Sequence, residues 1–280
     1  MKTLITIFIG LLVVGCGKEQ SVNTNDGNNT ATTSVPLEST NSKDESSNSE
    51  KQKIYNTIRK KLGKLDEPLI NDDLLSVKEL NLNHIGINDF TILQELTNLT
   101  HLHLWVDGDE NFAPLRKLPN LTHLLLWGIK VIDLTTLEEI PNLRYLGLRD
   151  MQIKDLAPLA KLPNLYTLSL SEVHNADLDR NSLLLRDNKL PDLIPLAGIT
   201  NLKHLILQGN KITDLKPLEK LINLTELNLS YNKITDLTSL EKLTNLERLY
   251  LVNNPNLTKA LIAELQKALP KCKIQHNAKK

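Results

Sequence analysis

A regular spacing of leucines runs through most of the chain. Pairs of leucines separated by one residue recur at Leu80/Leu82, Leu102/Leu104, Leu124/Leu126, Leu146/Leu148, Leu168/Leu170, Leu205/Leu207, Leu227/Leu229 and Leu249/Leu251. An asparagine precedes most pairs at a constant distance, at Asn98, Asn120, Asn142, Asn164, Asn201, Asn223 and Asn245. Because side chains alternate between the two faces of a strand, both leucines of a pair point to the same side. The pattern predicts one short strand in every repeat of 22 residues.

Short strands with a single apolar face are not stable alone. Stacked repeats pair their strands in parallel and merge their leucines into one core. After the strand, the sequence Asp-Leu-x-Pro-Leu occurs at residues 155–159 and 214–218. Asp caps helical turns, and Pro is tolerated in a first turn because its missing N–H would be unpaired there. We therefore expect a short 3-10 or irregular segment on the convex side of each repeat.

The turn that leaves the strand differs between early and late repeats. Late repeats hold an asparagine whose amide can bond backbone groups, at Asn210, Asn232 and Asn254. The early repeats hold Asp107, Ile129, Met151 and Val173 at this position. The early turns are therefore expected to be built in a different way.

One step in the repeat is longer than the others. Asn164 and Asn201 are 37 residues apart, which is 22 plus 15. Leu183, Leu185 and Asn188 in this stretch have the spacing of another strand and turn. The segment is either a ninth, shortened coil or a loop insert at about residues 171–181, and we favour the shortened coil.

These repeats resemble the leucine-rich-repeat consensus, in the 22-residue class of bacterial internalins. The resemblance covers residues 76–256, and seven copies in phase make it specific. It implies an α/β fold, a leucine-rich-repeat solenoid with short parallel strands on its concave face. Solenoids of this kind use the concave face for binding. The expected function is recognition of a protein or peptide, without enzymatic activity.

Both ends of the repeats carry helical patterns, as expected for caps that cover an open core. In residues 51–75, Ile54, Ile58 and Leu62 are spaced like one helix face, and Asn71 is the expected N-cap residue of a second short helix. This segment resembles the N-terminal cap of internalin-like proteins. In residues 257–280, a helix is expected before Pro270, followed by a last strand that holds a buried, inert Cys272.

The beginning of the chain has the form of a targeting segment. Residues 4–14 are apolar but shorter than the roughly 20 residues that span a bilayer. The end of this stretch, Val13-Val14-Gly15-Cys16, resembles the lipobox of bacterial lipoproteins. The resemblance implies a signal peptide at 1–15, a lipid on Cys16 and anchoring to a membrane of a bacterial cell envelope. Residues 16–50 are too polar to offset the entropy of ordering and are expected to form a tether.

Charge and motifs exclude several functions. Lys and Arg together number 33, as do Asp and Glu. The chain therefore lacks the excess of positive charge that is typical of nucleic-acid-binding proteins. No phosphate-binding loop, nucleophile with a base in register, or pair of carboxylates is present. We expect a monomer with no cofactor that is not an enzyme.

The residues beside the leucines are expected to face solvent on the concave side. Candidate partner-binding residues on the second to fourth repeats are His101, His103, Trp105, His123, Leu125, Trp127, Tyr145 and Arg149. Trp, Tyr and Arg dominate binding hot spots. Between the two rows of aromatic residues, Leu125 and Gly147 are expected to leave an apolar dip.

Other ligands remain open at this stage. His101, His103 and His123 offer three imidazoles, the kind of ligand that zinc and copper accept, but no carboxylate in register orients them. Residues 107–111 begin like a calcium-binding loop but lack its later Gly and Glu. We therefore predict no metal site. The alternative to a protein partner is a small-ligand, metal or carbohydrate receptor that uses the His/Trp cluster.

Overall fold

The computed structural model describes residues 42–106, 112–128, 131–149, 151–153, 155–170, 190 and 192–279. Contacts group residues 41–280 into one compact unit. The signal peptide, Cys16, the acidic turn at 107–111 and the stretch 171–189 lie outside the described residues.

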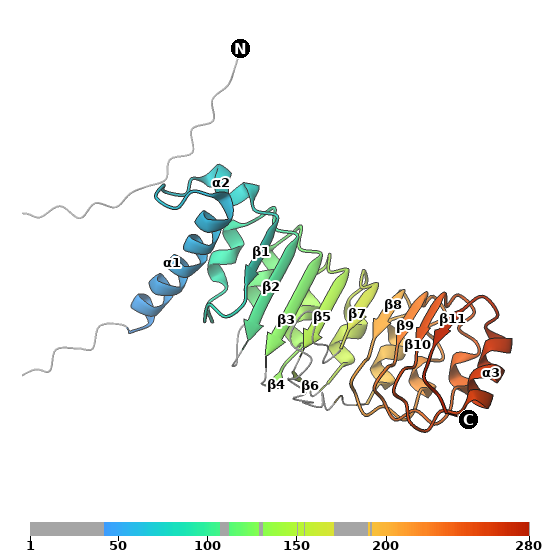
Figure 1. The fold of residues 1–280 in the computed structure, drawn as a ribbon. Coiled ribbons are helices and arrows are strands. Elements are labelled where there is room, and N and C mark those ends of the chain that lie inside the picture. Colours follow the sequence, from blue (N-terminus) through green and yellow to red (C-terminus); the bar gives the residue numbers. More distant parts are fainter. Residues whose placement is uncertain are drawn as a thin grey trace, which may run out of the picture. The chain divides into compact units, whose positions relative to one another are not determined.

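Nine parallel strands form one sheet in the part of the chain that the structure describes (Figure 1). They are β1 (Glu79–Leu82), β2 (His101–Val106), β3 (His123–Gly128), β5 (Tyr145–Arg149), β7 (Thr167–Ser169), β8 (His204–Ile206), β9 (Glu226–Asn228), β10 (Arg248–Tyr250) and β11 (Lys273–Gln275). Leucines of neighbouring repeats pair in register, for example Leu102 with Leu124, and both are fully buried. This arrangement confirms the predicted solenoid with its single leucine core.

The convex side consists of 3-10 helices, as predicted. They are η1 (Thr91–Glu95), η2 (Ala113–Lys117), η3 (Thr135–Glu139), η4 (Ala157–Lys161), η5 (Ile194–Gly198), η6 (Lys216–Leu218) and η7 (Thr238–Leu240). The repeated aspartate lies just before six of these seven helices, all except η2, and accepts a hydrogen bond from the N–H two residues later. Asp155 accepts from Ala157 and Asp214 from Lys216, each at 2.8 Å.

Two ladders of asparagines connect consecutive coils. The asparagine that precedes β2, β3, β5 and β7 to β10 donates from its side-chain amide to a carbonyl of the previous coil, as Asn245 does to Ile222 at 2.9 Å. The buried turn asparagines donate to several carbonyls at once, and Asn232 bonds to Leu207 at 2.9 Å and to Leu229 at 3.0 Å. These bonds satisfy backbone groups that have no partner within their own coil.

An early turn is built differently, as predicted. Met151 replaces the turn asparagine and is buried with 1 % exposure. Beside it, β4 (Val131–Ile132) and β6 (Gln152–Ile153) pair as a separate parallel sheet of two strands. Backbone pairing and an apolar side chain here replace the amide ladder of the later repeats. The other early turn positions named above lie outside the described residues.

The preference for a ninth, shortened coil was wrong. Thr167 of β7 pairs directly with His204 of β8, and the N–H of Leu170 bonds to the carbonyl of Ile206 at 2.8 Å. The sheet therefore has no position for a strand between β7 and β8. The physical reason is length, since 15 extra residues are too few to complete a coil of 22.

The N-terminal cap is longer than predicted. Helix α1 (Ser42–Leu62) begins nine residues before residue 51, inside the segment expected to be a tether. The carboxylate of Glu50 accepts hydrogen bonds from the N–H groups of Asn88 and Asp89 at 2.9 and 2.8 Å. Lys53 donates to the carbonyl of Gly86 at 2.9 Å. These contacts with the first repeat hold a polar helix that its own composition would not stabilise.

The second cap helix, α2 (Asn71–Ser76), begins one residue earlier than predicted, because its N-cap residue is Ile70 and not Asn71. Asp73 accepts a hydrogen bond from the N–H of Ile70 at 3.0 Å and forms an ion pair with Lys64 at 2.8 Å. The hydrogen bond from Lys64 and that from Ile70 lower the pKa of the Asp73 carboxyl.

The C-terminal cap agrees with its prediction. Helix α3 (Lys259–Ala268) is capped by the hydroxyl of Thr258, and β11 extends the sheet beside β10. Cys272 is buried with 4 % exposure, and burial raises the pKa of its thiol, which favours the inert form. Among the described helices, none is long and apolar enough to cross a membrane.

Candidate functional site

The candidate residues form three rows across β2, β3 and β5, in the register predicted from the repeat. The rows are His101–His123–Tyr145, His103–Leu125–Gly147 and Trp105–Trp127–Arg149. Every side chain in them is half-buried except at Gly147, which is buried. We call these nine residues the aromatic patch.

The first row is a stack of rings. The rings of His101 and His123 lie 4.0 Å apart at 16°, and those of His123 and Tyr145 lie 5.7 Å apart at 18°. The hydroxyl of Thr100 donates to the carbonyl of Lys78 at 2.8 Å and lies 2.9 Å from Nδ1 of His101. Since a hydroxyl has one proton, Nδ1 of His101 is the donor of this second bond, and its Nε2 is left as an acceptor.

Thr122 repeats this arrangement one coil later. Its hydroxyl oxygen is 3.3 Å from the carbonyl of Thr100 and 2.9 Å from Nδ1 of His123. Burial, together with the nearby His101, lowers the pKa of His103 and of His123 from the ordinary value of 6.5. Both imidazoles are therefore neutral at neutral pH. Nε2 of the neutral His123 ring can therefore accept a hydrogen bond from a ligand.

The third row holds both tryptophans of the protein. Trp105 is covered on one side by His84, whose ring centroid lies 4.7 Å away. Trp127 is covered by the guanidinium of Arg149, 5.1 Å from the centre of the indole. Each indole therefore packs against a neighbour, so part of the row is held by its own contacts.

His84 belongs to the site and was missed from the sequence. It follows β1 and has a positive φ of 62°, which is uncommon for a residue with a side chain. This conformation carries the imidazole over Trp105 in the next coil. The available signal was the Asn-His-x-Gly sequence at residues 83–86, which is typical of a turn but does not indicate the direction of the ring.

The predicted apolar dip in the middle row is not present. A Cβ atom at Gly147 would lie 2.3 Å from Cδ1 of Leu125 and 3.3 Å from Cε1 of Tyr145. Leu125 therefore occupies the space above Gly147 and fills it. The glycine lets the leucine and the tyrosine pack down onto the sheet, and the patch has an apolar centre without a hollow.

Two nitrogen donors of the third row lack partners. Nε1 of Trp127 and Nε of Arg149 are shielded from solvent, and no acceptor among the described residues forms a hydrogen bond with either. Buried donors without acceptors are rare and cost free energy. The third row thus combines apolar rings with unused donors, which is the composition of a binding surface.

The three histidines do not converge on a metal. The rings of His101 and His123 are stacked face to face, which directs their nitrogens side by side. Within the residues that the structure describes, no group of three His, Cys, Asp or Glu side chains could hold an ion. The covered face of each indole likewise leaves less surface for a sugar ring to stack on.

Concave residues of the later coils bond to one another instead. Arg248 forms an ion pair with Glu226 at 2.6 Å. The side-chain amide of Asn228 donates to Gln208 at 3.0 Å. These pairs satisfy the polar groups of β9 and β10, so this half of the face has fewer groups available for a partner.

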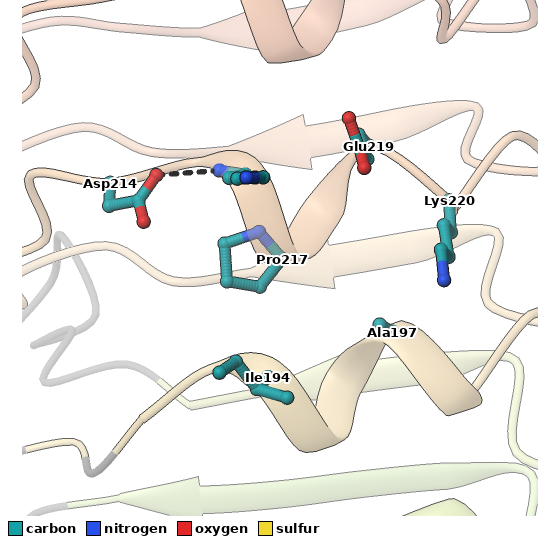
Figure 2. A pocket seen from close by; sticks show the side chains of 7 residues that line it. Ile194, Ala197, Asp214, Pro217, Glu219 and Lys220 are labelled. Atoms are coloured by element: carbon teal, nitrogen blue, oxygen red, sulfur yellow. Dashed lines mark hydrogen bonds between the residues drawn. The ribbon is translucent and has the colours of Figure 1, made fainter.

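A depression lies on the convex side, between η5 and η6 (Figure 2). It has a volume of about 300 Å³ and is lined by Ile194, Ala197, Asp214, Lys216, Pro217, Glu219 and Lys220. Ile194 and Ala197 lie on one side of it and Pro217 on the other, and Asp214 bonds to the N–H of Lys216. The depression is lined by both acidic and basic side chains, so its charge favours neither anionic nor cationic ligands.

Comparison with known proteins agrees with this fold. The family model "Leucine Rich repeats (2 copies)" matches residues 141–180 and 222–266. The structure is similar to an internalin (inlF) of Listeria monocytogenes, with a TM-score of 0.60 and 26 % identity over 81 % of this chain and 63 % of that one. It is also similar to internalin C2 of the same species, with a TM-score of 0.61 and 26 % identity over 80 % of this chain and 92 % of that one. No curated protein is significantly similar in sequence.

Proposed function

We propose that this internalin-like leucine-rich-repeat protein recognises a protein or peptide partner with the aromatic patch on its concave face. The observation that carries the proposal is the row Trp105–Trp127–Arg149, which is half-buried and has two unpaired donors. Concave faces of solenoids provide extended binding surfaces. Trp, Tyr and Arg are the residue types that contribute most to the binding free energy of interfaces.

The position of the two tryptophans outside the leucine core supports the same proposal. The leucines under the patch are fully buried on the opposite face of the sheet from Trp105 and Trp127. Half-exposed indoles gain roughly 25 cal/mol for each Å² of apolar surface that a partner removes from water. The neutral imidazole of His123 adds an acceptor and the guanidinium of Arg149 adds donors, and a peptide offers partners for both.

The test begins with peptides selected by the wild-type protein from a displayed random octapeptide library. Both tryptophans of the chain lie in the patch, so intrinsic fluorescence reports binding there. Trp127→Ala should weaken binding by about 2 kcal/mol or more, the usual hot-spot threshold. Its thermal midpoint should remain close to that of the wild type.

The matched control is Tyr250→Ala, which removes a half-buried concave ring on β10. It should leave binding unchanged. Selected peptides that bind Trp127→Ala at full strength would place the binding surface elsewhere and overturn the proposal.

We also propose that Cys16 is lipidated and anchors the protein to a membrane of a bacterial cell envelope. The support is the lipobox-like sequence that ends in Cys16 after a short apolar stretch. Stable anchoring requires more than one acyl chain. Cys16→Ser should abolish metabolic labelling with a fatty acid and release the protein from membranes, and continued labelling of this variant would contradict the proposal.

A further inference from the structure

Within the part of the chain that the structure describes, Arg149 has no anionic partner. Its guanidinium lies over the ring of Trp127, and its Nε is shielded from solvent without an acceptor. Among the described residues, no carboxylate forms an ion pair with it. Guanidinium groups bind carboxylates with two parallel hydrogen bonds, and a half-buried one without such a partner is costly. The Trp127 ring holds the group in a fixed orientation, which lowers the entropy that a ligand would have to remove.

The surroundings of Arg149 favour a negative ligand. On the concave face of the described residues, the strands β2, β3, β5, β7 and β8 carry no acidic side chain. Basic residues precede three strands, at Lys78, Arg144 and Lys203, and all three are exposed. Among the described strands on either side of these five, β1 carries Glu79, at the edge of the patch, and β9 carries Glu226, which is already paired with Arg248. A carboxylate on a partner would thus meet complementary charge at Arg149, where the third row of the patch ends.

We propose that the partner is an acidic peptide segment, and that Arg149 binds one of its carboxylates. This inference rests on the proposed binding function. The carboxylate accepts hydrogen bonds from the guanidinium, while an apolar side chain next to it in the peptide covers Trp127 and Leu125. Backbone N–H groups of the peptide donate to Nε2 of His101 and His123.

The peptides selected by the wild-type protein are synthesised with an acetylated N-terminus and an amidated C-terminus. Asp or Glu should be enriched among them, and replacement of that residue by Asn or Gln should weaken binding at least tenfold. Arg149→Gln should weaken binding of the acidic peptide at least tenfold and leave the neutral peptide almost unaffected. This loss of additivity identifies a direct contact between the two groups.

Two further variants keep the result interpretable. Arg248→Gln removes a concave arginine that already has a partner, and it should leave binding unchanged. Arg149→Lys retains the charge without the planar fork, so its affinity should fall between those of wild type and Arg149→Gln. The peptide substitution requires no change in the protein, so it gives an answer even where a variant folds poorly.

The outcomes separate this inference from the proposed function. Peptides that require Trp127 but lack acidic residues and tolerate Arg149→Gln would overturn the inference and leave the binding function standing. The absence of any peptide that depends on Trp127 would overturn both. A peptide that binds only with a free C-terminal carboxylate supports the same chemistry and places the carboxylate at the end of the partner chain.

Discussion

Replacing Asn232 by Ala tests how much the turn asparagines stabilise the solenoid. The side chain is 3 % exposed and lies where the coil turns out of β9. Its amide nitrogen donates to the carbonyls of Leu207 at 2.9 Å, Leu229 at 3.0 Å and Ser230 at 3.3 Å. Its oxygen accepts from the N–H of Ile212 at 3.0 Å.

The expected loss follows from the partners that remain. The carbonyl of Leu207 keeps a bond from Asn210 at 3.0 Å, and that of Leu229 keeps one from Asn254 at 2.9 Å. Ala therefore removes net contributions of about 0.5–1.5 kcal/mol for each strong bond, without leaving every partner unpaired. Together with the space left by the amide, we expect the free energy of unfolding to fall by about 2–4 kcal/mol.

Urea unfolding followed by circular dichroism measures this loss, with Asn245→Ala as the matched control. Asn245 is exposed and donates one hydrogen bond, to the carbonyl of Ile222 at 2.9 Å. Its removal should lower the free energy of unfolding by about 0.5–1 kcal/mol. Equal losses from the two variants would refute the view that burial and multiple bonding set the contribution of each ladder.

The variant Asn232→Asp tests the hydrogen bonds that the side-chain amide of Asn232 donates. The carboxylate has nearly the shape of the amide but has no N–H, and it would face the carbonyl oxygens of Leu207 and Leu229. At neutral pH this variant should therefore unfold more easily than Asn232→Ala, because one oxygen of a buried carboxylate would face carbonyl acceptors. The difference should narrow on acidification, when the carboxyl regains a proton. A variant as stable as the wild type at neutral pH would contradict the assigned bonds.

Two further predictions concern the core and the patch. Leu205 is fully buried, so Leu205→Ala should cost about 2–5 kcal/mol in urea unfolding, while Gln208→Ala on the concave face should cost less than about 1 kcal/mol. Because burial lowers the pKa of His103 and of His123 in the folded protein, the unfolded chain binds more protons just below the ordinary value of 6.5. Stability should therefore be constant above that pH and decline as the pH falls through 6.5 toward the folded pKa. His123→Gln should reduce the slope of this decline in unfolding measured between pH 7 and 5, and an unchanged slope would contradict the assignment.

The sheet and its register could be predicted because the repeat constrains every coil in the same way. Leu-x-Leu at a spacing of 22 determines which residues pair, so His101, His123 and Tyr145 were expected in one row and lie there. The start of α1 was not predictable from local composition. Its first turns are polar, and the contacts that hold the helix join Glu50 and Lys53 to a turn more than thirty residues later.

The details of the patch depended on side-chain packing, which spacing alone does not specify. Gly147 indicated an open space, but a flexible neighbour, Leu125, bends into the space that a glycine leaves. His84 stands outside the strand pattern and reaches Trp105 only through its positive φ. The unpaired donors of the third row were also invisible in the sequence, because pairing depends on which acceptors the folded chain brings near.

The contrast between the two halves of the concave face gives the strongest reason to place the partner on the early coils. The core beneath both halves is the same ladder of leucines, so stability does not explain why their outward residues differ. Over β9 and β10 the polar groups pair with one another, as Glu226 does with Arg248. Over β3 and β5, Trp127 and Arg149 pack together yet keep donors without acceptors. In the described residues, the late half of the concave face pairs these polar groups, whereas the early half leaves two donors unpaired. This difference favours the early half as the surface that binds a partner.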